Sequence, residues 1–423
     1  MIHIVTQGDT LETIANQYGV SPDRIVYDNQ LPSPTNLVLG QALLILIPNT
    51  IHEVSQGETL ETIAASYNMT VKQLKRNNPF LLQNETVTPG EYLVISYEGE
   101  KIGSLKVGGY AYTYINQAIL QEALLYIDEL LVFSYGYTEE GVIIPPENPS
   151  RLVEEARKNE VSPILVLTPS TSQGTFDNQL VKKLSEDLNL QQTLIQNLLL
   201  TVQQEGYDGV DVDFEYILPE SREGYAGFVR SLTTIMNENG YRVSVALAPK
   251  VAADQPGLLY EGVDYGLLGE SANSVFLMTY EWGYTYGPPM AVAPINKVKQ
   301  VLDYAVTAIP PDKISMGIPN YGYDWPLPFE RGVTKARSIG NVQAIEIAAA
   351  QGATIQFDQT AMSPYFTYEE NGVTHEVWFE DVRSIEEKVR VALSYGFMGI
   401  GYWNLMRRFR SNWLLLHWLL RLS

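Results

Sequence analysis

The sequence predicts an α/β protein, a (β/α)8 TIM barrel preceded by two small modules of the βααβ type. Two observations carry this prediction. The first hundred residues contain an internal repeat, which indicates a duplicated supersecondary unit. After residue 106, β-rich apolar runs alternate with amphipathic stretches, as in a sheet of parallel strands joined by helices.

The repeat aligns residues 4–15 with residues 53–64, at an offset of 49 residues (53 − 4). Each copy predicts a short strand, a tight turn, two helices and a closing strand. Thr10 and Thr59 stand at helix N-cap positions, and apolar residues at helical spacing follow them. We therefore place the modules at residues 1–48 and 51–97, and a polar, Gly-containing linker at 98–106.

The remaining residues, 107–423, contain eight β-rich runs and predict the barrel. The gap between the seventh and eighth runs is much longer than the others. It predicts a small α+β insertion at about 328–381, with a helix over 342–350 and a hairpin turn at 370–372. The eight runs are 107–112, 130–135, 163–168, 209–214, 242–247, 274–280, 314–318 and 399–403.

Composition excludes several classes of function. The net charge of −21 disfavours binding to nucleic acid, which needs clustered Lys and Arg. The absence of cysteine excludes disulfides, thiolate zinc sites and cysteine nucleophiles. The four histidines show no metal-ligand spacing, and there is no P-loop or dinucleotide fingerprint. We expect no cofactor, no metal and a monomeric protein.

The chain ends predict no membrane attachment. The N-terminus lacks the basic and apolar regions of a signal peptide, and no run of about 18 apolar residues exists. The apolar tail at 413–420 predicts the end of a packed helix rather than an anchor. Arg407, Arg408 and Arg410, just before it, are expected to form a solvated helix start.

Four carboxylates lie within residues 208–215, on the fourth β-rich run. Because side chains alternate along a strand, Asp211, Asp213 and Glu215 should share one face, opposite an apolar face. Carboxylates packed together repel each other, so at least one should keep its proton, as a general acid must. Asp208 is out of phase with the others and is expected to support a turn.

Two resemblances follow from these residues. The pattern Val-x-Gln-Gly-(Asp/Glu)-Thr-Leu-x-x-Ile-Ala, complete in both repeats, resembles the LysM module, which binds glycans containing N-acetylglucosamine. The resemblance places the sugar groove at the turn after Gly8 or Gly57 and the loop before the closing strand. The pattern Asp-Gly-x-Asp-x-Asp-x-Glu at 208–215 resembles glycoside hydrolase family 18, the chitinase-like family, and this resemblance covers about 107–423.

The second resemblance implies substrate-assisted catalysis with net retention. Glu215 would be the acid and base, and the substrate's 2-acetamido carbonyl would be the nucleophile. Asp213 would orient the acetamido N–H, and Asp211 would share a proton with Asp213, so that the pair titrates as a unit. The resemblance also implies that Tyr280 donates its hydroxyl to the acetamido carbonyl.

The residues around Tyr280 extend the match. Met278 would line the floor, and Glu281 stands where the family usually has Asp, which puts its sugar contact in doubt. Trp403 would form the aromatic floor under the −1 sugar, completed by Tyr110 and Phe133. Further candidates for sugar stacking are Trp282, Tyr321, Tyr323 and Trp325. The family's Ser-x-Gly-Gly motif on the third strand is replaced here by Thr-Pro-Ser at 168–170.

Two LysM modules before such a barrel resemble the spore cortex-lytic N-acetylglucosaminidases of endospore-forming bacteria. This resemblance implies action on peptidoglycan strands in the spore during germination. The −1 sugar needs a free acetamido group, which muramic δ-lactam has lost, so N-acetylglucosamine should occupy −1. Three alternatives remain open at this point: a chitinase, a non-catalytic lectin of the same fold and a metal-dependent hydrolase.

Overall fold

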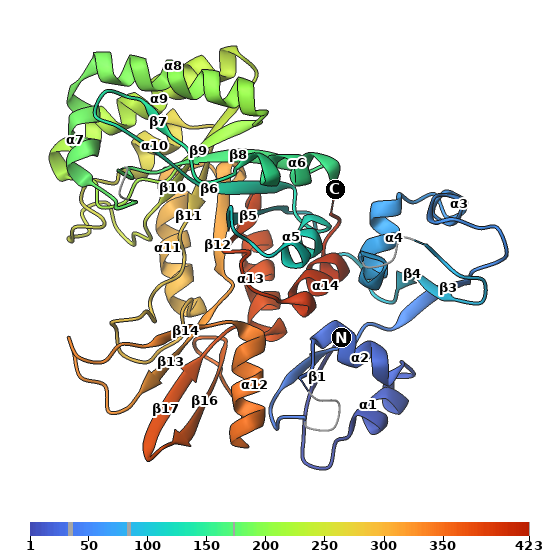
Figure 1. The fold of residues 1–423 in the computed structure, drawn as a ribbon. Coiled ribbons are helices and arrows are strands. Elements are labelled where there is room, and N and C mark those ends of the chain that lie inside the picture. The colour runs from blue at the N-terminus through green and yellow to red at the C-terminus, as the bar shows by residue number, and fades with distance from the viewer. Residues whose placement is uncertain (33–36, 83–85, 172–173, 423) are drawn as a thin grey trace.

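The two repeats fold as two βααβ modules in the computed structural model, which describes residues 1–32, 37–82, 86–171 and 174–422 (Figure 1). Thr10 and Thr59 each accept a hydrogen bond from the backbone N–H three residues later, as predicted. The first module contains β1 (Ile2–Ile4), α1 (Leu11–Tyr18), α2 (Pro22–Asn29) and β2 (Ala42–Leu44). The second contains β3 (Pro48–Glu53), α3 (Leu60–Ser66), α4 (Val71–Asn77), a 3₁₀ turn η1 (Pro79–Leu82) and β4 (Tyr92–Tyr97).

Eight parallel strands form a closed barrel, because β5 pairs with both β18 and β6. The fourth and sixth strands are shorter than their sequence runs: β9 ends at Val212 and β11 at Leu277, so the site residues lie just beyond the strands. The barrel strands are β5 (Lys106–Tyr112), β6 (Glu129–Tyr137), β8 (Ser162–Leu167), β9 (Gly209–Val212), β10 (Arg242–Leu247), β11 (Ser274–Leu277), β12 (Ile314–Pro319) and β18 (Gly399–Trp403).

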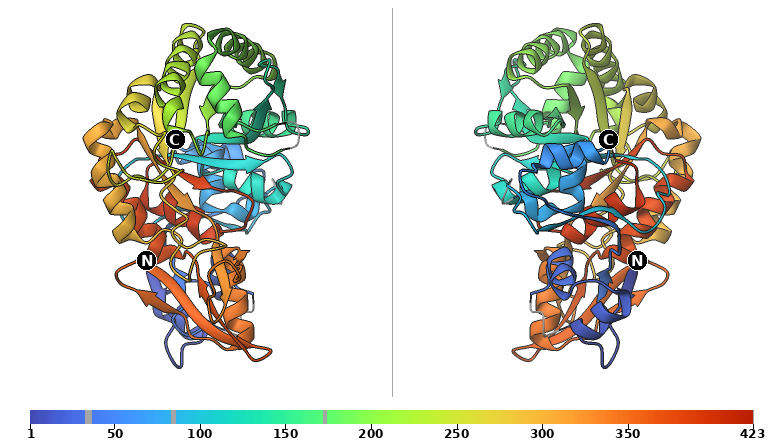
Figure 2. Two further views of the ribbon diagram at one scale, coloured as in Figure 1. Left: turned by 90° about the vertical axis from the view of Figure 1, so that its left-hand side faces the viewer. Right: turned by 90° about the vertical axis from the view of Figure 1, so that its right-hand side faces the viewer.

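Helices cover the outside of the barrel, and their buried faces join one hydrophobic core with the strands (Figure 2). A short β7 (Ile143–Ile144) pairs with the end of β6. The helices are α5 (Gln117–Leu124), α6 (Ser150–Lys158), α7 (Asn178–Glu186), α8 (Leu188–Glu205), α9 (Arg222–Glu238), α10 (Tyr265–Ser271), α11 (Ile295–Ala308), α13 (Val382–Ser394) and α14 (Arg410–Leu419), with 3₁₀ turns η2 (Pro219–Ser221) and η3 (Pro311–Lys313).

The insertion between β12 and β18 is an antiparallel five-stranded sheet with one helix. Its strand order is β14-β13-β17-β16-β15, and β16 and β17 form the predicted hairpin, with Glu370 paired to Val373. The elements are β13 (Gly322–Pro326), β14 (Arg337–Ile339), α12 (Asn341–Gln351), β15 (Gln356–Asp358), β16 (Ser363–Glu370) and β17 (Val373–Trp378).

The first module packs beside the insertion, at the end of the barrel where β12 and β18 finish (Figures 1 and 2). Val38 of this module belongs to the insertion's hydrophobic core. The backbone N–H of Ile355 donates to the carbonyl of Leu39 (2.8 Å). Leu44 and Leu46 belong to the barrel core. The module is therefore held against the barrel and its insertion by buried apolar surface.

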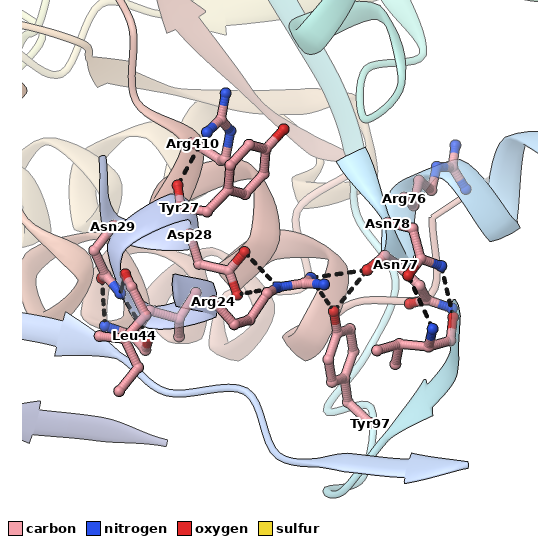
Figure 3. Close-up of polar contacts among 12 residues, drawn as sticks. Arg24, Tyr27, Asp28, Asn29, Leu44, Arg76, Asn77, Asn78, Tyr97 and Arg410 are labelled. Atoms are coloured by element: carbon pink, nitrogen blue, oxygen red, sulfur yellow. Dashed lines mark hydrogen bonds and ion pairs between the residues drawn. The ribbon is translucent and has the colours of Figure 1, made fainter. Parts of the chain in front are cut away.

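Polar contacts join the two modules to each other (Figure 3). Arg24 on α2 donates to both carboxylate oxygens of Asp28 (2.7 and 2.8 Å) and to the carbonyl of Asn77 on α4 (2.8 Å). Tyr97, at the end of β4, donates to the same carbonyl (2.7 Å). Asp28 is almost fully buried, so this network fixes the angle between the modules.

The expectation of a solvated helix start before the tail is wrong for Arg410. Its guanidinium lies 3.9 Å from the centre of the Tyr27 ring and donates to the Tyr27 carbonyl (2.9 Å). It also pairs with Glu122 of α5, and the Arg410 side chain is only 16% exposed. Sequence could not show this, because the partners lie nearly 300 or more positions away along the chain.

The apolar tail forms α14, a packed helix as predicted, with Trp413 to Leu416 buried. Among the described residues, no helix is both long and apolar enough to cross a bilayer. The linker runs beside this helix: Trp418 donates to the carbonyl of Glu98 (2.7 Å).

Candidate active site

The carboxylates lie along and just after β9, with the two faces arranged as the period of a strand predicts. Val210, Val212 and Phe214 point into the packing between barrel and helices and are fully or almost fully buried. Phe214 stacks on Tyr225 of α9, with ring centroids 5.4 Å apart. The opposite face carries the acids, which therefore point to the barrel interior.

Asp211 is the deepest acid and is fully buried. It accepts hydrogen bonds from the hydroxyls of Tyr110 (2.9 Å) and Ser244 (2.5 Å). Burial raises the Asp211 pKa to about 6, and the two hydroxyl donors oppose this rise. Ser244 is paired with Asp211 across β9 and β10, a relation that sequence alone did not reveal.

Asp213 and Glu215 line a cleft of about 1130 Å³ at the carboxyl ends of the strands. Burial, then the charges of Glu215 and Asp211, raise the pKa of Asp213 well above its usual range. The pKa of Glu215 is also raised, by burial first and then by the charge of Glu281. The buried Oδ1 of Asp213 has no hydrogen-bond partner among the described residues.

Tyr280 lies across the cleft, just beyond β11, and is only 8% exposed. Burial, and then the nearby charge of Asp213, raise its pKa well above the usual value, so its hydroxyl keeps its proton. Met278 and Trp282 also line the cleft, as the sequence predicted. The cleft therefore combines a proton donor, carboxyl groups and an apolar wall.

Trp403 lies within a cluster of aromatic rings on the cleft floor. Its ring centroid is 5.0 Å from that of Phe133, 5.6 Å from Tyr110 and 6.1 Å from Tyr112. Tyr112 was not predicted, although it is the next in-phase position after Tyr110 on the first run. Phe276 also joins the floor, packed on Tyr110 at 5.2 Å.

Glu281 has a left-handed backbone, with φ of 68°. It accepts hydrogen bonds from the hydroxyls of Tyr321 (2.5 Å) and Tyr323 (3.0 Å). These two tyrosines were candidates for sugar stacking, but here they orient a carboxylate. Trp325, another such candidate, is fully buried and donates to the carbonyl of Gly287 (2.8 Å), so it cannot reach a sugar.

The remaining predicted positions lie outside the cleft or at its edge. Asp208 forms an exposed pair with Arg157, which agrees with a supporting role. Thr168 is buried and its hydroxyl lies 2.8 Å from that of Ser170, which reaches the cleft wall. No group of three or more potential metal ligands occurs within the described ranges. The loops assigned by resemblance to LysM sugar binding fall partly on 33–36 and 83–85, outside those ranges.

Family comparisons cover both parts of the chain. Residues 174–407 match the model of glycosyl hydrolases family 18, and residues 3–46 and 52–96 match the LysM domain. A cortical fragment-lytic enzyme of Bacillus subtilis is 39% identical over 420 residues, which is 98% of this chain and 97% of the relative. A putative sporulation-specific glycosylase of the same bacterium, YdhD, is 33% identical over 416 residues.

Solved structures give the same picture. The spore cortex-lytic enzyme SleL of Bacillus cereus superimposes with a TM-score of 0.83 at 35% identity, covering 99% of this chain and 98% of that one. A chitinase of Chromobacterium violaceum superimposes with a TM-score of 0.69 over 74% of this chain, but at 24% identity it shares only the fold.

Proposed function

This chain belongs to glycoside hydrolase family 18, and from that membership we propose how its cleft cuts the peptidoglycan of the spore cortex. The protein is a glycosidase acting on the cortex glycan, and the substrate's own 2-acetamido group assists the reaction. The observation that carries the residue assignment is the convergence of Asp213, Glu215 and Tyr280 on one cleft above an aromatic floor.

In the first step, Glu215 protonates the glycosidic oxygen as the bond to the leaving sugar breaks. The acetamido carbonyl oxygen attacks the anomeric carbon from the other face and forms an oxazolinium ion. Burial, and then the charge of Glu281, raise the pKa of Glu215, which favours the protonated form that a general acid needs. Because the nucleophile comes from the substrate, no second protein carboxylate has to reach the anomeric carbon.

Two groups hold the acetamido group in place. The Oδ1 of Asp213, which has no partner among the described residues, accepts a hydrogen bond from the acetamido N–H. This hydrogen bond becomes stronger when the nitrogen becomes positive in the oxazolinium ion. The hydroxyl of Tyr280 donates to the carbonyl oxygen and orients it for attack. Asp211, held by Tyr110 and Ser244, lies beneath Asp213 and tunes its charge.

In the second step, Glu215 has become a carboxylate and removes a proton from the incoming water. The water attacks the anomeric carbon, opens the oxazolinium ring and gives net retention of configuration. Trp403 and Phe133 supply the apolar floor on which the −1 sugar stacks. Exclusion of water by this floor strengthens the electrostatic interactions above it.

The mechanism also selects the bond that is cut. The −1 sugar must carry a free acetamido group, which excludes muramic δ-lactam, and we propose that N-acetylglucosamine occupies −1. Mass spectrometry of cortex fragments should show N-acetylglucosamine at every new reducing end. Muramic acid at those ends would refute the assignment.

The matched variants are Glu215→Gln and Asp208→Asn. The first should bind cortex fragments but lose turnover by about 10²-fold or more, since it removes the acid. The second alters an exposed carboxylate of the same motif and should keep near-normal turnover. Digestion of chitin in preference to cortex fragments would favour the chitinase alternative.

We propose that both LysM modules bind the glycan strand while the barrel cuts it, and that the protein acts as a monomer at the cortex. The net charge of −21 disfavours nucleic acid as a partner. Light scattering in solution gives the oligomeric state directly, and a mass of two chains would overturn the monomer.

A further inference from the structure

A second cavity, of about 600 Å³, lies where the first LysM module, the insertion and the barrel meet. Helix α2 of the module forms one wall, and the start of α12 forms another. The loop after β18 supplies Arg407 and Arg408 to the lining, and the first residue of α14 supplies Arg410. The cavity therefore exists only because the module is docked, and it gathers three cations in a chain of net charge −21.

These arginines differ in the ion pairs and hydrogen bonds that their guanidinium groups already form. Arg410 is held by Glu122 and by the carbonyl of Tyr27. Arg407 donates to the hydroxyl of Ser338 (3.0 Å), and its buried Nη1 has no hydrogen-bond partner among the described residues. Among the residues that the structure describes, neither Arg407 nor the exposed Arg408 forms an ion pair.

The start of α12 adds to the positive potential. Gly340 is the N-cap of this eleven-residue helix and has no side chain to satisfy the first turn. The glycine lies against Arg407, since an added Cβ would be 3.4 Å from the Arg407 Cδ. A helix N-terminus beside arginines favours an anion. The lining also contains one carboxylate, Glu346, which lies one turn further along the helix.

The cavity lies close to the catalytic cleft, although no described residue lines both. Trp403 lies on the cleft floor, and Arg407 follows it by four residues. On the cleft side, Tyr321 and Tyr323 hold Glu281. Burial lowers the pKa of Arg407, and the nearness of these two tyrosines opposes that fall. Because residues of the first module line this cavity, a glycan strand held by both the cleft and that module would lie near it.

We propose that the cavity binds a carboxylate of the peptide stem that a muramoyl residue carries on the same glycan strand. The inference rests on the proposed function, because it assigns a position to part of that substrate. Arg407 and Arg408 bind the carboxylate, since a guanidinium matches the two oxygens of a carboxylate. The carboxylate of Glu346 repels negative charge, so the cavity favours a ligand with a single carboxylate over a polyanion.

The test compares two preparations of one substrate: cortex strands with their peptide stems, and the same strands after an amidase has removed the stems. Arg408→Gln and Arg407→Gln should each raise KM for stem-bearing strands by about tenfold, as expected for one lost charge-assisted hydrogen bond. On stripped strands KM should change less than about twofold. The value of kcat should stay the same on both.

Arg331→Gln is the matched control, because Arg331 is an exposed arginine of the insertion outside the cavity. Inorganic phosphate should compete with stem-bearing strands in the wild type and fail to compete in Arg408→Gln. An equal rise of KM on both substrates would mean that the arginines only support the fold, and unchanged KM on both would mean that no stem binds. Phosphate binding without any effect of the stems would assign the cavity to free anions.

Two of these outcomes would refute stem binding in the cavity and would leave the proposed reaction unaffected. The proposed function fails only if the wild-type enzyme leaves muramic acid at the new reducing ends. That measurement uses no arginine variant, so the two failures are distinguishable.

Discussion

Replacing Asp211 with asparagine should make the stability of the fold less dependent on pH. Asp211 is fully buried, and burial raises its pKa from 3.8 to about 6 although Ser244 and Tyr110 donate to it. Because the folded-state pKa lies above the unfolded value, the folded protein holds the proton more tightly. The stability gained below about pH 4 is lost as the pH rises through about 6.

The magnitude follows from the shift. From 3.8 to about 6 is about 2.2 pH units, or about 3 kcal/mol at about 1.36 kcal/mol per unit. Of this, about 2 kcal/mol falls between about pH 4.5 and about pH 7.5. Asparagine carries no charge, so the variant avoids this loss. It also loses one acceptor, because the amide nitrogen cannot accept from Ser244 or Tyr110, at a pH-independent cost of about 1–3 kcal/mol.

The assay is urea unfolding of both proteins at the two pH values. The quantity to compare is the change in the free energy of unfolding with pH, in which the pH-independent cost cancels. That change should be more favourable in Asp211→Asn than in the wild type by about 2 kcal/mol. Asp208→Asn, which removes an exposed paired carboxylate, is the control. Equal pH dependence in wild type and Asp211→Asn would refute the reasoning.

Three further outcomes are expected. Tyr280→Phe should lower kcat by about 10²-fold with little change in KM, as for a lost donor to the reacting carbonyl; a pure KM effect would contradict that role. Glu281→Gln should move the alkaline limb of the kcat/KM profile to lower pH, because the charge of Glu281 adds to burial in raising the pKa of Glu215. An unmoved limb would mean that Glu281 does not affect the pKa of Glu215. Arg24→Met should lower the free energy of unfolding by about 3 kcal/mol in urea, since it leaves Asp28 buried and unpaired, and adding Asp28→Leu should recover much of the loss. Full stability of the single variant would mean that buried Asp28 does not depend on Arg24.

Most of the catalytic strand was predictable from sequence, because its information is local. Side chains alternate along a strand whatever surrounds it, so Asp211, Asp213 and Glu215 had to oppose Val210 and Val212. The repeat was equally local: the caps at Thr10 and Thr59 depend on residues three positions away. The sequence also led to the barrel, since eight runs alternating with helices leave few other arrangements.

Contacts between distant segments were not predictable in this way. Trp325 follows the seventh run just as Trp282 follows the sixth, yet Trp325 is buried and Trp282 reaches the cleft. Ser244 was missed because it meets Asp211 only through the pairing of two strands. In each case the missing information was which segment comes to lie next to another.

The sequence by itself determined the barrel, the repeat and the row of acids at the fourth strand, because each follows from spacing along single strands and helices. The tertiary structure alone decided which hydroxyls hold Asp211, and that Tyr321 and Tyr323 hold Glu281 rather than a sugar. It also decided that the arginines before the tail meet the first module. These features depend on closing the barrel and docking the module, and both join residues that no local rule of spacing relates.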